Sequence, residues 1–138
     1  MNRTVLLLSV TLAVGITVGV IGTQILKAQQ EPIKRTVLLK TDLPGIEGKE
    51  ARLILSEYAP GAAAGKHYHP GHEFVYLLEG SGVLEVEGKP PVTVNPGGVF
   101  YQPPNQVHNF KNPSTTNHLK LLVFFIPEKE KPFTVPMQ

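Results

Sequence analysis

The 138-residue sequence contains no cysteine and no tryptophan. Without cysteine, the chain has no disulfide scaffold, no thiol nucleophile, no iron–sulfur cluster and no cysteine-ligated zinc site. A strong charge imbalance is also missing, because 13 basic residues stand against 11 acidic ones. The excess lies in residues 1–28, which hold Arg3 and Lys27 and no acidic residue, so the remaining chain is neutral. With no basic stripe in the part that folds, we expect no nucleic-acid partner.

Short apolar stretches separated by turn-forming residues run through the chain after residue 30. Glycine and proline contribute 13 residues each, and they cluster in turn sequences such as Asn95-Pro96-Gly97-Gly98. No stretch in this part shows helical periodicity of useful length. We expect β-strands at about residues 35–40, 51–58, 66–69, 73–79, 82–87, 92–94, 99–102, 107–111 and 119–126. This spacing predicts an all-β sandwich or barrel, and the chain length allows one domain.

Residues 4–26 form an uncharged, apolar run of 23 residues. Such a run is too apolar for a surface helix, and it predicts either an export signal or a membrane anchor. The small residue Ala28, followed by two glutamines, fits a cleaved signal and places the mature protein in the periplasm or outside the cell. Four basic residues between positions 27 and 40 follow the run, and they favour the alternative, a membrane anchor formed by residues 4–26.

The stretch Leu121–Ile126 is apolar on both faces of the expected strand. One face should line the core, and the other must also be covered, because an exposed apolar strand invites pairing or aggregation. A second subunit would cover it in a homodimer. The N-terminal arm and the proline-rich tail are the alternative covers.

Four histidines and a glutamate form the pattern with the clearest chemical meaning. His67 and His69 are two residues apart, so in a strand both imidazoles lie on one face, with Cα atoms about 6–7 Å apart. Glu73 follows after a Pro-Gly turn that returns the chain close to this pair, and His108 comes from a later strand. Three neutral imidazoles and a carboxylate would make a mixed nitrogen and oxygen site for a divalent transition metal. His72, the fourth histidine, sits in the turn, where a surface position fits it better than a proton-carrying role.

Two segments resemble the conserved motifs of the cupin superfamily. Gly61–Gly80 is similar to the first motif, in which glycine, His-x-His, glutamate and a second glycine recur at fixed spacing. Gly97–Asn112 is similar to the second motif, with Asn105 where glycine is usual. Asparagine tolerates positive φ better than most residues, so the turn can be kept. The resemblance implies a single cupin-type, jelly-roll-like β-barrel after an N-terminal apolar helix.

The same resemblance implies a division of the chain and a ligand set. The segments are a signal peptide or anchor (1–28), an N-terminal arm (29–48), a cupin β-barrel (49–126) and a C-terminal tail (127–138). The metal, one divalent ion of Mn, Fe, Cu, Ni or Zn, would be bound by His67, His69, Glu73 and His108. Glu73 is also the candidate catalytic base. Five aromatic residues near these motifs are expected in the core rather than against substrate: Phe74, Tyr76, Phe100, Tyr101 and Phe110.

The function implied by the resemblance is that of a metal-dependent oxidoreductase, similar to small cupin dioxygenases, acting on a small substrate with oxygen donors. A non-catalytic module that binds a metal or small ligand is the alternative, since no second acid or base is evident beside the quartet. Isomerase or lyase chemistry is a third possibility, because one fold hosts many reactions.

Overall fold

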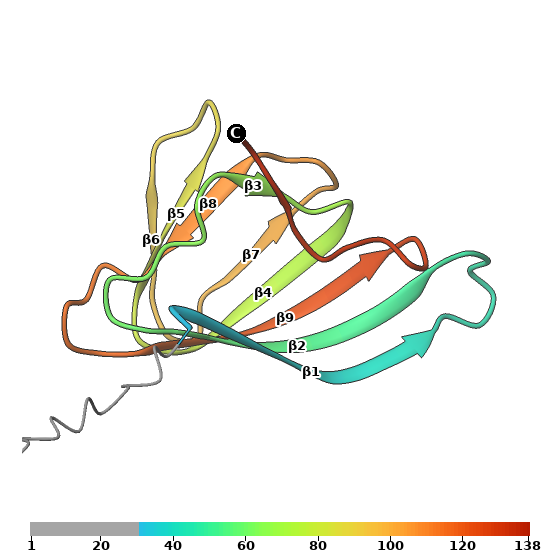
Figure 1. Cartoon of the computed structure of the whole chain (residues 1–138), viewed down its shortest axis with the longest axis horizontal. Coiled ribbons are helices and arrows are strands. Elements are labelled where there is room, and N and C mark those ends of the chain that lie inside the picture. Colours follow the sequence, from blue (N-terminus) through green and yellow to red (C-terminus); the bar gives the residue numbers. More distant parts are fainter. Residues whose placement is uncertain (1–30) are drawn as a thin grey trace, which may run out of the picture.

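Strands with alternating buried and exposed side chains build the protein, and β4 (Gly71–Glu79) shows this alternation most regularly. The computed structural model describes residues 31–138, which form two antiparallel five-stranded sheets (Figure 1). The first sheet has the order β1 (Ile33–Asp42), β2 (Glu50–Tyr58), β9 (Leu119–Pro127), β4 and β7 (Val99–Gln102). The second has the order β10 (Val135–Pro136), β3 (His67–Tyr68), β8 (His108–Lys111), β5 (Gly82–Val86) and β6 (Val92–Val94).

The all-β prediction is confirmed for these residues. Every strand expected from the sequence is present, and the only strand of the described chain that was not expected is β10. The expected N-terminal helix lies outside the described residues. Within them, no helix is long and apolar enough to cross a membrane.

The core lies between the two sheets, which face each other in Figure 1. Ile54, Val75 and Phe125 project into it from the first sheet, and Leu84 and Phe110 project from the second. Phe125 is completely buried, so its truncation to alanine would cost about 3–5 kcal/mol. After β9 the chain turns back across the open end of the barrel and pairs with β3 through β10.

Asn105 has a φ of 64°, in the left-handed region that glycine usually occupies. The sequence expectation for this turn is therefore confirmed, and asparagine takes the conformation that the motif requires. Its backbone N–H donates to the carbonyl of His69 at 2.9 Å. The turn thus ties the second motif to a residue of the first.

Three aromatic residues expected in the core lie on the outside of the first sheet. Phe74, Tyr76 and Tyr101 are each at least 44% exposed, whereas Phe110 is buried and Phe100 packs against the core. The alternation of side chains along a strand explains why the prediction was wrong for these three residues. On β4 the inward positions belong to Glu73 and its alternate neighbours, and the β4–β7 register pairs Phe74 with Tyr101 on the opposite face.

The outer face of the first sheet is apolar around these residues, and we call it the outer aromatic face. It comprises Phe74, Tyr76, Leu78, Val99, Tyr101, Leu122 and Phe124. Neither cover proposed from the chain itself lies over it in the described residues. β1 of the N-terminal arm pairs edge to edge with β2, and the tail pairs with β3 of the other sheet.

Candidate metal centre

Strand pairing brings the four predicted ligands to one place inside the barrel. His67 on β3 lies directly opposite His108 on β8, and His69 follows β3 before the turn into β4. Glu73 occupies an inward position of β4, so the carboxylate shares the face of the imidazoles. Each histidine is 3% exposed and Glu73 is 5% exposed. The structure therefore places all members of the predicted quartet together in the interior.

The donor atoms of the quartet converge with the spacing of a coordination shell. His67 Nε2 lies 3.2 Å from His69 Nε2. Glu73 contacts His69 Nε2 at 3.3 Å through Oε1 and His108 Nε2 at 3.4 Å through Oε2. Metal–nitrogen bonds of about 2.1 Å place neighbouring ligands roughly 3.0–3.4 Å apart in octahedral or tetrahedral geometry. These three separations match this range, and the donor atoms of the three histidines all lie within 4.8 Å of one another.

Backbone carbonyls determine which ring nitrogen of each histidine faces the centre. Nδ1 lies 2.7 Å from the Gly65 carbonyl in His67, 2.5 Å from the Phe133 carbonyl in His69, and 2.8 Å from the Gln106 carbonyl in His108. A carbonyl only accepts hydrogen bonds, so each Nδ1 carries the proton and each neutral ring presents an Nε2 lone pair. This is the outer-shell arrangement typical of metal-binding histidines.

The quartet fits a divalent transition metal. Three Nε2 lone pairs and a carboxylate point at one another, an arrangement that is repulsive unless a cation lies between them. Glu73 Oε2 is buried and has no hydrogen-bond donor. A cation with a preference for nitrogen and oxygen ligands would satisfy every one of these atoms.

The protonation states of the quartet also suit a metal. Burial would raise the pKa of Glu73, but hydrogen bonds and positive charge from His108 and His69, which these rings supply when Nε2 is protonated, lower the pKa to about 2. Burial lowers the pKa of His67 to about 4, against the opposing effect of its hydrogen bond to the Gly65 carbonyl. At neutral pH the carboxylate is thus ionised and the His67 ring is neutral. Metal ligands must be deprotonated in this way before they bind.

The sequence interpretation missed several residues that share the cavity with the quartet. The cavity has a volume of about 20 Å³, and Arg35, Ser56, Tyr58 and Phe133 line it together with the quartet. Burial raises the pKa of Tyr58 to about 12, with the nearby Arg35 opposing the rise, so the phenol stays protonated. A signal for two of these residues was present, because Ser56 and Tyr58 share the buried parity of β2 with Ile54.

The remaining two histidines lie at the surface, as expected for His72. His72 is exposed on the outer face of β4, where its Nδ1 and the Tyr101 hydroxyl form a hydrogen bond of 2.8 Å. His118 is exposed before β9. Neither contributes to the quartet, which makes His72 a suitable control for experiments on the metal ligands.

Comparison with known proteins identifies the family of this chain. A family model described as "Cupin domain" matches residues 54–125, more than half of the chain, so the chain belongs to this family. The solved cupin-like protein from Thermotoga maritima MSB8 is 23% identical, with a TM-score of 0.61 over 76% of this chain and 75% of that one. No curated protein matches the chain.

Two further solved structures share the fold and have named activities. The DMSP lyase DddQ from Ruegeria pomeroyi DSS-3 is 18% identical, with a TM-score of 0.64 over 80% of this chain, which spans 54% of that lyase. The polyketide cyclase RemF from Streptomyces resistomycificus is 22% identical, with a TM-score of 0.61 over 78% of this chain and 72% of that one. At these identities the likeness shows the fold alone.

Proposed function

We propose that this cupin is an enzyme that binds one divalent transition metal through His67, His69, Glu73 and His108. The observation that carries the proposal is the convergence of three unprotonated Nε2 atoms on a buried carboxylate that lacks a donor for Oε2. An octahedral metal held by these four ligands would keep two positions open for a substrate, whereas a structural metal site uses ligands that close the whole shell. The substrate would be a small molecule with oxygen donors.

The reaction class that we propose is that of an oxidoreductase of the dioxygenase type. A bound metal would supply Lewis-acid or redox chemistry at positions that the protein ligands leave open. Glu73 serves this site better as a ligand than as a base. Its two carboxylate oxygens lie 3.3 Å from His69 Nε2 and 3.4 Å from His108 Nε2, so both oxygens are part of the centre.

Lyase or isomerase chemistry without dioxygen is a second candidate, and Tyr58 is the observation that favours it. The sequence showed no further acid or base, but the Tyr58 side chain lines the same cavity as the quartet and stays protonated. A buried phenol can donate a hydrogen bond or a proton to a substrate oxygen. Two structural neighbours, a DMSP lyase and a polyketide cyclase, have names from outside oxygenase chemistry.

Oxygen uptake and substrate loss, measured on the same sample, separate these activities. The protein would be loaded in turn with Mn, Fe, Cu, Ni and Zn and mixed with small hydroxy acids, keto acids and diols. Substrate loss with equivalent oxygen uptake supports the oxidoreductase, and substrate loss without uptake supports the lyase or isomerase. Metal binding without any turnover would favour a binding module. The His108→Ala variant should be inactive and His72→Ala active, whereas equal activity in both would contradict the proposed centre.

We also propose that a second copy of the chain covers the outer aromatic face. The face is apolar and exposed, and the N-terminal strand and the tail both lie elsewhere in the described residues. Two copies related by a two-fold axis would bury the same patch on each subunit. Phe74 stacks on Tyr101 with ring centres 4.9 Å apart, which gives the patch a rigid aromatic centre.

Export to the periplasm or the exterior is proposed from residues 1–28, which lie outside the described residues. The apolar run and the ending at Ala28 support a cleaved signal, and a retained anchor over residues 4–26 is the alternative. Mass spectrometry of the mature N-terminus distinguishes the two. A chain that starts at Gln29 supports cleavage, and a chain that starts at Met1 supports the anchor.

A further inference from the structure

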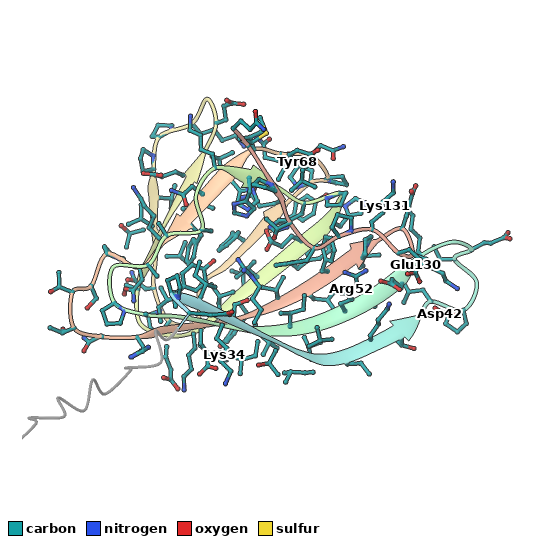
Figure 2. All side chains as sticks on the ribbon, viewed as in Figure 1. Lys34, Asp42, Arg52, Tyr68, Glu130 and Lys131 are labelled. Carbon is teal, nitrogen blue, oxygen red and sulfur yellow. The ribbon has the colours of Figure 1, made fainter. Side chains whose placement is uncertain are left out.

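Arg35, an exposed residue of β1, contributes a cationic side chain to the lining of the cavity that holds the quartet. In the β1–β2 register Arg35 lies opposite Ser56, which is buried and faces the interior. Both side chains line the cavity. The side chain of the preceding residue, Lys34, projects to the outside of the sheet (Figure 2), as strand alternation requires.

Phe133 connects this guanidinium to a predicted metal ligand. Arg35 Cζ lies 5.6 Å from the centre of the Phe133 ring. The same ring stacks on the imidazole of His69, with centres 4.5 Å apart and planes inclined by 29°. Arg35 and His69 thus both contact Phe133. The Phe133 ring lies between the guanidinium and the predicted metal ligand His69.

Arg35 has no carboxylate partner within the described residues, in contrast to the other arginine there. Arg52 forms an ion pair with the buried Glu50 and donates to the Lys131 carbonyl at 2.8 Å. No ion pair between residues 31 and 138 includes Arg35. An arginine that lines a cavity without an acidic partner offers its planar donors to a ligand.

The charges of the residues that line the cavity indicate which kind of ligand would bind there. Glu73 is the only acidic residue in the lining, and Arg35 is the only permanent cation. With a divalent ion on the quartet, the net charge is about +2, which favours an anionic ligand. Guanidinium groups match carboxylates through two parallel hydrogen bonds. The cavity volume of about 20 Å³ limits the part of the ligand that enters to a few atoms.

We propose that the substrate class of this site is a small carboxylate that carries a second oxygen donor on the adjacent carbon, as hydroxy acids and keto acids do. The carboxylate binds to Arg35, and the second oxygen faces the quartet. Ser56 and Tyr58 present neutral hydroxyl groups from β2 to the same cavity, and these complete a polar wall on this side of the site. The inference rests on the proposed metal centre, because the second oxygen needs a metal to bind.

Glycolate and ethylene glycol form a matched pair of probes for this proposal. They have similar size and share a hydroxyl donor, but only glycolate has a carboxylate. The protein is loaded with Co²⁺, whose visible absorption bands report both the uptake of the metal and changes in its ligands. We expect glycolate to perturb the bands of the wild type at concentrations at least about tenfold lower than ethylene glycol.

Variants at neighbouring positions test the role of Arg35. Arg35→Gln should weaken glycolate binding by about tenfold to a hundredfold and leave ethylene glycol unchanged. Arg35→Lys should lie between the wild type and Arg35→Gln, because lysine keeps the charge and loses the paired donors. Lys34→Gln removes a charge from the same strand but on its outer side, 66% exposed and paired with Glu57, and it should bind glycolate as the wild type does.

The same spectra separate the two ways in which the proposal can fail. Normal Co²⁺ uptake by Arg35→Gln, with glycolate affinity equal to the wild type, overturns the carboxylate inference and leaves the metal centre intact. Equal affinity of the wild type for both probes has the same consequence. Absence of Co²⁺ bands in the wild type refutes the proposed metal centre itself, and the inference that rests on it fails with it.

Discussion

Replacing His108 with alanine is expected to abolish the stabilisation that a divalent metal gives to the fold. His108 holds its Nε2 3.4 Å from Glu73 Oε2, and it is the only member of the quartet contributed by the second motif. Without it, two histidines and the carboxylate remain. His108 is buried, and among the described residues no histidine outside the quartet belongs to this group that could take its place.

The expected magnitude follows from linkage between binding and folding. At a free metal concentration 100 times the dissociation constant, binding to the folded state adds about 2.7 kcal/mol to the free energy of unfolding. For a domain of this size that corresponds to a rise of roughly 10 °C in the unfolding midpoint. If loss of His108 weakens binding about a hundredfold, the same metal concentration adds only about 0.4 kcal/mol, or roughly 2 °C.

Thermal unfolding followed by circular dichroism measures these values on protein first stripped with EDTA. The metal-free variant lacks a buried imidazole and its hydrogen bond to the Gln106 carbonyl, so the metal-induced shift of each protein is measured from its own metal-free midpoint. His72→Ala should keep the full metal-induced shift. The reasoning is refuted if the wild type shows no shift with any of the five metals, or if His72→Ala loses as much of the shift as His108→Ala.

Further outcomes are expected from the turn, the buried histidine and the outer aromatic face. Asn105→Ala should lower the free energy of unfolding by about 1 kcal/mol in urea titrations while Asn105→Gly leaves it nearly unchanged, because only glycine adopts the φ of 64° without strain; equal losses would contradict this. The metal-free protein should lose up to about 3 kcal/mol between pH 6.5 and 4, since burial lowers the pKa of His67 from 6.5 to about 4 and only the unfolded chain takes up that proton in this interval. The loss of stability should be smaller in His67→Gln. A wild-type free energy of unfolding that stays constant between pH 6.5 and 4 would contradict the lowered pKa of His67. Tyr76→Asp should shift the protein from dimer to monomer in analytical ultracentrifugation without changing Co²⁺ uptake, and a wild type that is monomeric at micromolar concentration would refute the proposed interface.

The strands were predictable because short apolar stretches bounded by turn residues encode them. β5 alternates toward its end, β9 is a nearly continuous apolar run, and each turn between strands carries glycine, proline or asparagine. β10 was not predictable, because it has only two residues, one of them proline, and exists through its pairing with the distant β3. The exposed aromatics were misassigned for a different reason. Phe74, Tyr76 and Tyr101 were judged by their hydrophobicity, although the inward position of Glu73 already determined the opposite parity for its neighbours.

The quartet was predictable because its spacing lies within two local motifs, whereas the rest of the cavity depends on long-range contacts. Arg35 reaches the cavity through the β1–β2 register, and Phe133 reaches it because the tail turns back across the barrel. Neither position carries a local pattern that distinguishes it from an ordinary arm or tail residue. Tyr58 lies on a strand that was predicted, and the structure shows that it shares the buried face of that strand with Ile54 and Ser56.

This division between local and long-range determinants suggests how the site acquires its selectivity. The residues proposed to hold the metal come from positions 67–108, inside the part that matches the family model, while Arg35 and Phe133 lie outside it. Phe133 links the two sets, because its carbonyl accepts from His69 Nδ1 at 2.5 Å and its ring contacts both His69 and Arg35. A change in the tail can therefore alter the orientation of a metal ligand and the wall that faces the substrate, with no change in either motif. Cupins that share the motifs but differ in the first strand and the tail would then keep the metal chemistry and bind different ligands, and the carboxylate selectivity proposed here belongs to the variable part of the molecule.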